Sequence, residues 1–109
     1  MRTIDVKEVT AAVSKLSKDA CYYLPDEMMA ALEASLTSEG SPLGREILET
    51  IIENAKLAKT TDCPICQDTG LAVVFAEIGQ DVHFEGGDLY EAIHAGIADG
   101  YINGYLRKS

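Results

Sequence analysis

The sequence predicts an α+β fold that is mainly helical, with three helices, a short strand pair and then a fourth helix. Two observations predict this order. Apolar residues recur at three- and four-residue spacing in four segments, which is the pattern of amphipathic helices. Between the third and fourth of these segments lies a mostly apolar run of residues that favour strands, as is typical of a buried strand. A chain of 109 residues is expected to form one domain.

The first two helices are expected over residues 4–20 and from Pro25 to about Ser38. The apolar face of the first consists of Val6, Val9, Val13 and Leu16. Proline is tolerated in a first helical turn, and the acidic pair that follows Pro25 suits the positive end of the helix dipole. The buried stripe of the second helix is predicted to comprise Met28, Leu32 and Leu36.

The third helix should begin at Ser41-Pro42, a capping residue followed by proline at the first helical position. Its helical pattern continues to residue 58, and the polar stretch 59–62 ends it. The broad apolar face of this helix is formed by Leu43, Ile47, Leu48, Ile51, Ile52 and Ala55.

Residues 71–78 are apolar on both faces and are expected to form a buried strand. A turn at 79–81 should lead into a second short strand at 82–85. Asp88, with Glu91 three residues later, resembles a capping box and predicts the start of the fourth helix. Its buried stripe should consist of Leu89, Ile93, Ile97 and Tyr101.

Three glycines lie four residues apart in this last helix, at Gly96, Gly100 and Gly104. Glycine in a helix interior costs roughly 0.5–1 kcal/mol relative to alanine, so three of them need a reason. Either another backbone approaches this face closely, from the same chain or a partner, or the helix is short and frayed. The sequence leaves both possibilities open.

Composition narrows the function. The chain carries 18 acidic and 9 basic residues, a net charge of −9, which disfavours nucleic acid and anionic membranes as partners. No apolar run approaches the roughly 20 residues that a bilayer requires, and three cysteines suit a reducing compartment, so we expect a cytoplasmic protein. If the substrate is an anion, most of the positively charged groups that bind it must come from elsewhere, because the chain has only three arginines.

Cys63 and Cys66 form a CxxC motif, whose spacing alone is compatible with three kinds of site. A zinc site would need a second ligand pair, and His83 and His94 are not spaced to provide one. A thioredoxin-like redox site would follow a strand and open a helix, whereas this motif follows a helix and precedes a strand. The third kind of site uses one of these cysteines as an iron–sulfur ligand.

The segment Cys66–Gly70, Cys-Gln-Asp-Thr-Gly, resembles the signature of the class I fumarate hydratases and the related tartrate dehydratases. The likeness extends over essentially the whole chain. It includes the segment from Ser41 to Asn54, the run 72–75, the turn 79–82 and the stretch from Gly100 to Ser109. The chain therefore resembles the N-terminal part of the α subunit of such an enzyme, and residues 1–109 are expected to be a single N-terminal domain or a fragment of a longer subunit.

The resemblance implies a 4Fe–4S cluster held by three cysteines, with one iron open to the substrate as a Lewis acid. Cys66 matches the first ligand of that cluster. Gln67 and Asp68 match residues that line the substrate, and Asp68 is a candidate acid/base group. The other cluster cysteines of the family lie beyond Ser109, and neither Cys21 nor Cys63 matches one of them.

The resemblance also implies partners: the remainder of the α subunit, a β subunit that carries most of the substrate-binding basic residues, and a small dicarboxylate. The expected activity is hydration of fumarate to (S)-malate, as part of a larger αβ enzyme of the tricarboxylic acid cycle, and the isolated chain is expected to lack both cluster and activity. One alternative is an α-subunit fragment of a tartrate dehydratase. Another is a non-catalytic domain used for subunit assembly.

Overall fold

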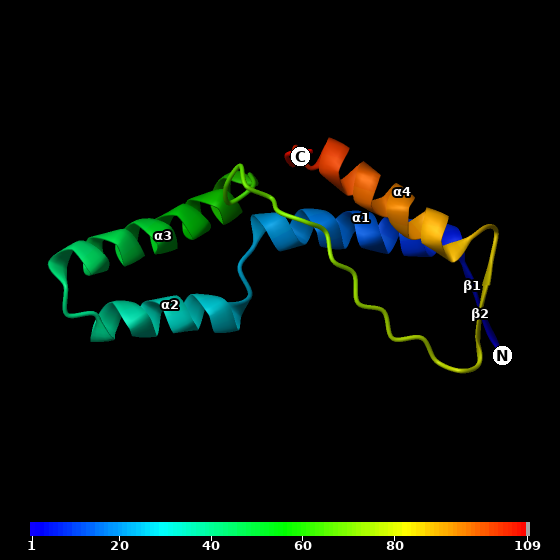
Figure 1. The fold of residues 1–109 in the computed structure, drawn as a ribbon, viewed down its shortest axis with the longest axis horizontal. Coiled ribbons are helices and arrows are strands. Elements are labelled where there is room, and N and C mark those ends of the chain that lie inside the picture. The colour runs from blue at the N-terminus through cyan, green and yellow to red at the C-terminus, as the bar shows by residue number, and fades with distance from the viewer. Residues whose placement is uncertain (109) are drawn as a thin grey trace. The chain divides into compact units, whose positions relative to one another are not determined.

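The computed structural model describes residues 1–108, whose contacts divide the chain into two compact units. One unit comprises Met1–Asp19 with Gln67–Ser109, and the other comprises Ala20–Cys66. Figure 1 labels the elements in chain order. They are β1 (Arg2–Asp5), α1 (Val6–Tyr22), α2 (Asp26–Ser38), α3 (Pro42–Thr61), β2 (Val82–Glu85) and α4 (Leu89–Asn103). The predicted fold class, mainly helical α+β with three helices, a strand pair and a fourth helix, is confirmed.

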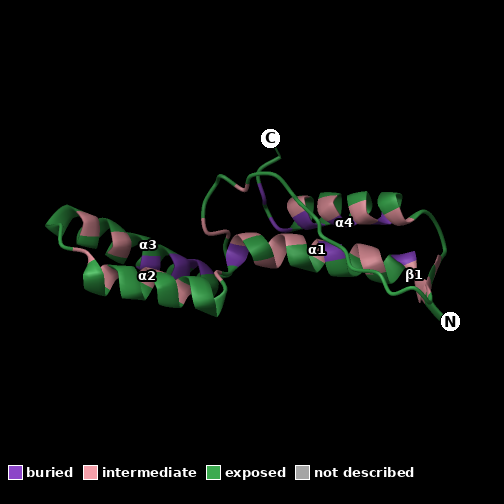
Figure 2. Cartoon of the chain, turned by 60° about the horizontal axis from the view of Figure 1, so that its bottom comes forward, coloured by how far each residue is buried: buried purple, intermediate pink, exposed green. Residues whose placement is uncertain are grey.

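In the first unit, α4 packs against α1 through its glycine face (Figure 2). A Cβ atom added at Gly96 would lie 2.7 Å from the carbonyl oxygen of Thr10, and one added at Gly100 would lie 2.7 Å from that of Ser14. Gly96 and Gly100 are buried along with Ala92. The glycine spacing therefore reflects close approach of another backbone, and that backbone is α1 of the same chain.

Two hydrogen bonds join these helices where they approach. The Thr10 hydroxyl donates to the carbonyl oxygen of Ala92 at 2.8 Å, and the Ser14 hydroxyl donates to a carboxylate oxygen of Asp99 at 2.6 Å. Small residues allow such contacts because no side chain holds the helices apart. The predicted stripe at Leu89, Ile93, Ile97 and Tyr101 is half-buried, beside the small residues that make the closest contact.

The strand pair is parallel and joins the two chain segments of the first unit. Arg2 pairs with Val82 and Asp5 with Glu85, so β1 lies beside a strand about 80 positions further along the chain. The strand predicted at 82–85 is thus confirmed. Residues 4 and 5, which were expected to open the first helix, belong to β1 instead, and α1 begins at Val6. Pairing with a distant strand overrides their helical periodicity.

The prediction of a buried strand at 71–78 is wrong. This segment forms neither helix nor strand, and all eight residues are exposed, with Leu71 at 89 % and Phe75 at 93 %. A strand needs a neighbour to accept its backbone hydrogen bonds, and β2 pairs with β1 rather than with this segment. A run that is apolar on both faces also needs covering layers on both sides, and the described residues provide none.

The second unit contains the α2–α3 hairpin. Both predicted starts are confirmed: α2 begins at Asp26 directly after Pro25, and the Ser41 side chain caps α3 by accepting from the Gly44 N–H at 3.2 Å. The hairpin is closed by Arg45, whose guanidinium donates to the Leu36 carbonyl oxygen at 2.8 Å.

Only part of the predicted apolar face of α3 is buried. Ile52 and Ala55 are buried together with Ala58, whereas Leu43, Ile47 and Ile51 remain 44–66 % exposed. On α2, Leu32 and Leu36 are half-buried and Met28 is half exposed. Two helices can cover only one stripe of each other, so the wider face of α3 stays in contact with solvent.

Candidate active site

The predicted site segment Cys66–Gly70 crosses the division between the two units, which falls between Cys66 and Gln67. Cys66, Gln67 and Asp68 are all exposed, and Thr69 is half-buried. The segment is irregular in conformation and follows α3 by only a few residues. Each side of the division is therefore described separately.

In the second unit, the end of α3 delivers the chain to Cys66. Asp62 ends the helix in the left-handed conformation with φ of 54°, and the N–H of Cys63 donates to the carbonyl oxygen of Ala58 at 3.0 Å. The Ile65 N–H donates to the Cys21 carbonyl oxygen at 2.9 Å, and the Asn54 side-chain amide donates to the Ile65 carbonyl oxygen at 2.8 Å. These bonds hold the loop that carries Cys66.

All three cysteines lie in this unit, within the described residues, and none forms a disulfide. Cys63 and Cys66 are exposed. Cys21 is half-buried, and burial raises the pKa of its thiol, with a further contribution from the negative charge of Cys66 nearby. Because the thiolate is the form that binds a metal, Cys21 is the least suited of the three to act as a ligand.

In the first unit, the end of α4 brings a basic segment against the second half of the site. Leu106 is buried, and its N–H donates to the Tyr101 carbonyl oxygen at 2.9 Å, which fixes the chain just beyond the helix. The next residue, Arg107, accepts a hydrogen bond at its carbonyl oxygen from the Thr69 hydroxyl at 3.0 Å. Gly70 follows with φ of +63°, a conformation that favours glycine.

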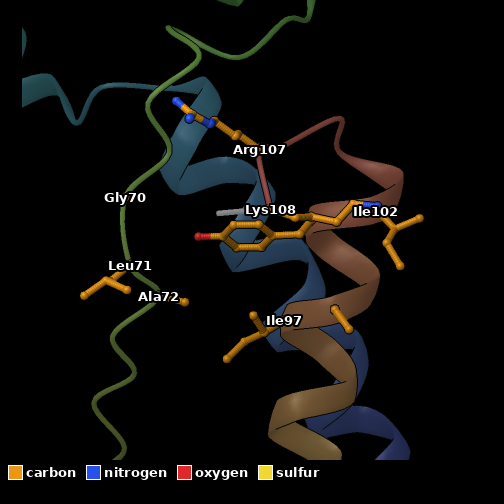
Figure 3. Close-up of a pocket in the computed structure, with 9 residues that line it drawn as sticks. Gly70, Leu71, Ala72, Ile97, Ile102, Arg107 and Lys108 are labelled. Atoms are coloured by element: carbon orange, nitrogen blue, oxygen red, sulfur yellow. The ribbon is translucent and has the colours of Figure 1, made fainter.

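An open groove of about 440 Å³ begins at this contact (Figure 3). Gly70, Leu71 and Ala72 form one side, and α4 forms the other, while Arg107 and Lys108 supply two positive charges. The remaining lining residues are Ile97, Ala98, Tyr101 and Ile102. Figure 3 shows the Arg107 and Lys108 side chains pointing in different directions, so the two cations do not converge on one point. Each can still attract a small organic anion to the edge of this apolar groove.

The sequence analysis did not assign Arg107 or Lys108 to the site. The contact between Thr69 and Arg107 joins residues 38 positions apart, and no local sequence pattern predicts it. The one relevant observation was the small number of arginines, and it led to the expectation that most of the positive charge comes from elsewhere.

The described part of the chain does not assemble a complete metal site. No group of three histidine, cysteine or acidic side chains within residues 1–108 is arranged to hold a metal ion. An exposed cysteine is nevertheless a suitable single ligand for iron, which binds soft thiolates. The donor set therefore fits one ligand of a cluster and does not by itself complete one.

Comparison with known proteins decides the family. The family model described as fumarate hydratase (Fumerase) matches residues 10–109. The chain belongs to this family. Fumarate hydratase family members are hydro-lyases, and the matched region includes the whole Cys66–Gly70 segment.

Two relatives illustrate how much of a subunit this fumarate hydratase family chain represents. A Methanocaldococcus jannaschii protein assigned as L(+)-tartrate dehydratase subunit alpha is 38 % identical over 76 residues, which cover 70 % of this chain and 27 % of the relative. The L(+)-tartrate dehydratase subunit alpha of Escherichia coli O157:H7 is 26 % identical over 104 residues, covering 95 % of this chain and 34 % of the relative. The chain thus spans about a third or less of the length of these relatives.

In the described residues, no helix is long and apolar enough to cross a membrane.

Proposed function

We propose that this chain is the N-terminal part of the α subunit of an iron–sulfur hydro-lyase that interconverts fumarate and (S)-malate, in the cytoplasm. The observation that carries the proposal is the contact between Thr69 and Arg107, because it brings the signature segment beside a cationic groove. A dicarboxylate requires positive charge, which is scarce in a chain whose net charge is −9.

In this proposal Cys66 is one of three thiolates that hold a 4Fe–4S cluster. The cluster, when bound, supplies a Lewis acid that polarises the oxygens of the substrate. The exposure of Cys66 supports this role, because a ligand to a shared cluster must be accessible from outside its own unit. The remaining ligands are assigned to the rest of the α subunit.

The other signature residues then act on the organic substrate. Hydration of fumarate adds a proton to one carbon of the double bond and a hydroxyl group to the other. Asp68 is proposed to move this proton, and the Gln67 amide to hold a substrate oxygen by a hydrogen bond. Arg107 is proposed to bind a carboxylate of the substrate, for which its planar guanidinium is well suited.

A second substrate is favoured by the relatives. Both proteins compared above are named as L(+)-tartrate dehydratase α subunits, and tartrate differs from malate by one additional hydroxyl group. The same groups would serve its dehydration, with Asp68 moving the proton and Arg107 binding a carboxylate. The name of the relatives as subunit alpha also supports a β subunit as partner.

The experiment is a paired assay of the assembled enzyme that contains this chain. Fumarate hydration and L(+)-tartrate dehydration are measured under anaerobic conditions, and kcat/KM is compared for the two substrates. Higher kcat/KM for fumarate supports the proposal, and higher kcat/KM for tartrate supports the second candidate. Absence of turnover with both substrates, in enzyme that retains its iron, would rule out both.

A further inference from the structure

The backbone of Ile65, immediately before Cys66, is held from both sides. Its N–H donates to the carbonyl oxygen of Cys21 at 2.9 Å, and its carbonyl oxygen accepts from the Asn54 side-chain amide at 2.8 Å. All of these residues belong to the second unit. Two bonds on one residue therefore fix the chain at the position from which Cys66 extends.

The first of these bonds uses a group that α1 leaves unpaired. Cys21 lies in the last turn of α1, where carbonyl oxygens have no partner four residues further along the helix. The Ile65 N–H satisfies one of these carbonyls. This bond orients the peptide unit that precedes Ile65.

The second bond comes from the interior of α3. Asn54 is exposed, lies in the middle of a 20-residue helix, and reaches the loop 11 positions further along the chain. Asparagine is a poorer helix former than alanine, so this position uses a residue that does not favour its own helix.

The bond from Asn54 acts directly on the geometry of Cys66. The Ile65 carbonyl belongs to the same planar peptide unit as the N–H of Cys66. Once the direction of that carbonyl is fixed, the Cα of Cys66 is fixed with it. The Cys66 sulfur can then move only by rotation about the N–Cα and Cα–Cβ bonds of Cys66, since the peptide unit before it is held.

We propose that Asn54 is a positioning residue that holds Cys66 in the orientation needed to bind the cluster. This inference rests on the proposed function, because it presumes that Cys66 is a metal ligand. It adds a residue outside the signature segment, on a different element, whose role is to reduce the freedom of the ligand before the metal binds.

The test compares Asn54→Ala with Thr50→Ala. Thr50 lies one turn earlier on α3, is neutral like Asn54, and donates its hydroxyl to the Glu46 carbonyl within the same helix. Both changes remove one side-chain hydrogen bond, but only Asn54→Ala releases the loop. Asn54→Asp is a third variant, because it keeps the size of the side chain and removes its donor.

Two measurements are made on the metal-free chain. The Ile65 amide keeps its own bond to Cys21 in all variants, but it exchanges only when the loop opens. Because the loop loses the bond from Asn54, opening should become easier and exchange should accelerate roughly five- to tenfold in Asn54→Ala and Asn54→Asp, and it should stay unchanged in Thr50→Ala. The ratio of Cys66 to Cys63 alkylation, resolved by mass spectrometry, should change in the same two variants only. Unchanged exchange and alkylation in both Asn54 variants would overturn the proposal.

A third measurement is made on the assembled enzyme. Iron release to a chelator should be faster in Asn54→Ala than in Thr50→Ala, at matched melting temperatures. Equal release from both variants would reduce Asn54 to a structural residue and overturn its positioning role. If the unsubstituted enzyme holds no iron at all, the proposed function fails, while the exchange and alkylation results still report separately whether Asn54 positions Cys66.

Discussion

The three cysteines of this chain have different environments, although all lie in one unit. Cys66 is exposed and sits in a loop held by Asn54, whereas Cys21 is half-buried at the end of α1 with its thiol pKa raised by that burial. Metal binding requires the thiolate, and burial makes the thiolate of Cys21 harder to form. Cysteines that are equivalent in the sequence therefore differ in their suitability as ligands. These environments favour Cys66 over Cys21 as the ligand, in agreement with the signature segment.

The residue-scale prediction concerns Asp68. Asp68→Asn in the assembled enzyme should lower kcat by roughly 10²- to 10⁴-fold, the usual contribution of a general acid/base, because asparagine keeps the shape but cannot transfer a proton. Iron content and the visible iron–sulfur absorbance should stay unchanged. The measurement is steady-state turnover together with iron analysis.

Asp81→Asn serves as the control for Asp68→Asn. It removes the same charge from another exposed aspartate of the first unit, and it should leave kcat within about twofold, as expected for a surface change away from the site. If Asp68→Asn loses activity only in proportion to its loss of iron, Asp68 is a structural residue of the loop and not a proton carrier.

At the scale of elements, local chemistry sets most of the boundaries. The cap at Ser41 and the cap at Asp88, whose carboxylate accepts from the Glu91 N–H at 3.0 Å, both involve residues three apart in the chain. Such contacts can be predicted from sequence because both partners lie in one short window. The close packing of α4 against α1 at the glycine face is a second feature of this scale, and its contribution to stability can be measured.

Gly100→Ala should destabilise the chain. The added Cβ would lie 2.7 Å from the Ser14 carbonyl oxygen, so α1 and α4 would have to move apart. Overpacking of this kind costs roughly 1–3 kcal/mol, against a gain in helix propensity of up to about 1 kcal/mol. The midpoint of urea unfolding, followed by circular dichroism, should fall.

The matched control is Gly40→Ala, at a position where an added Cβ meets nothing within 4 Å. Its unfolding midpoint should stay level or rise slightly, because alanine restricts the unfolded chain. A Gly100→Ala midpoint equal to or above that of Gly40→Ala would show that the close approach of α1 and α4 contributes nothing to stability.

The features that sequence could not supply all depend on distant partners. β1 pairs with β2 across about 80 positions, and the bond between Thr69 and Arg107 spans 38. The apolar run 71–78 was predicted as a buried strand from its composition, yet burial depends on a covering layer that composition does not reveal. For the same reason, the sequence could suggest Cys66, Gln67 and Asp68 through resemblance but could not place Arg107 beside them.

At the scale of the whole molecule, apolar surface remains open in both units. Leu71 and Phe75 are almost fully exposed in the first unit, and Leu43, Ile47 and Ile51 are exposed in the second. Leu43, Ile47 and Ile51 lie four residues apart along one face of α3, and an exposed apolar stripe of this kind is unusual for a monomeric soluble protein. It accords with a chain that spans about a third or less of the length of the two relatives compared above.

The isolated chain should therefore bind a hydrophobic dye such as ANS and self-associate as its concentration rises. The double variant Leu71→Ser and Phe75→Ser should reduce both effects, because it removes the two most exposed large apolar side chains of the 71–78 segment. Dye fluorescence and sedimentation velocity provide the measurements.

Tyr90→Ser is the comparison variant, since Tyr90 is 75 % exposed on α4, outside the 71–78 segment. It should leave dye binding and association close to those of the unsubstituted chain. Equal effects of Tyr90→Ser and the double variant would mean that the 71–78 segment is not the source of the association.

The central claim is that this chain contributes Cys66 as a ligand to the cluster of a hydro-lyase. It is tested most directly by measuring bound iron and hydro-lyase turnover in the anaerobically assembled enzyme carrying Cys66→Ser or Cys63→Ser. Serine removes the thiolate with little change in size, and Cys63 is a second exposed cysteine of the same unit. The account predicts that Cys66→Ser loses both the cluster and turnover, while Cys63→Ser keeps most of each. Retention of iron and activity in Cys66→Ser, or an equal loss in Cys63→Ser, would contradict it.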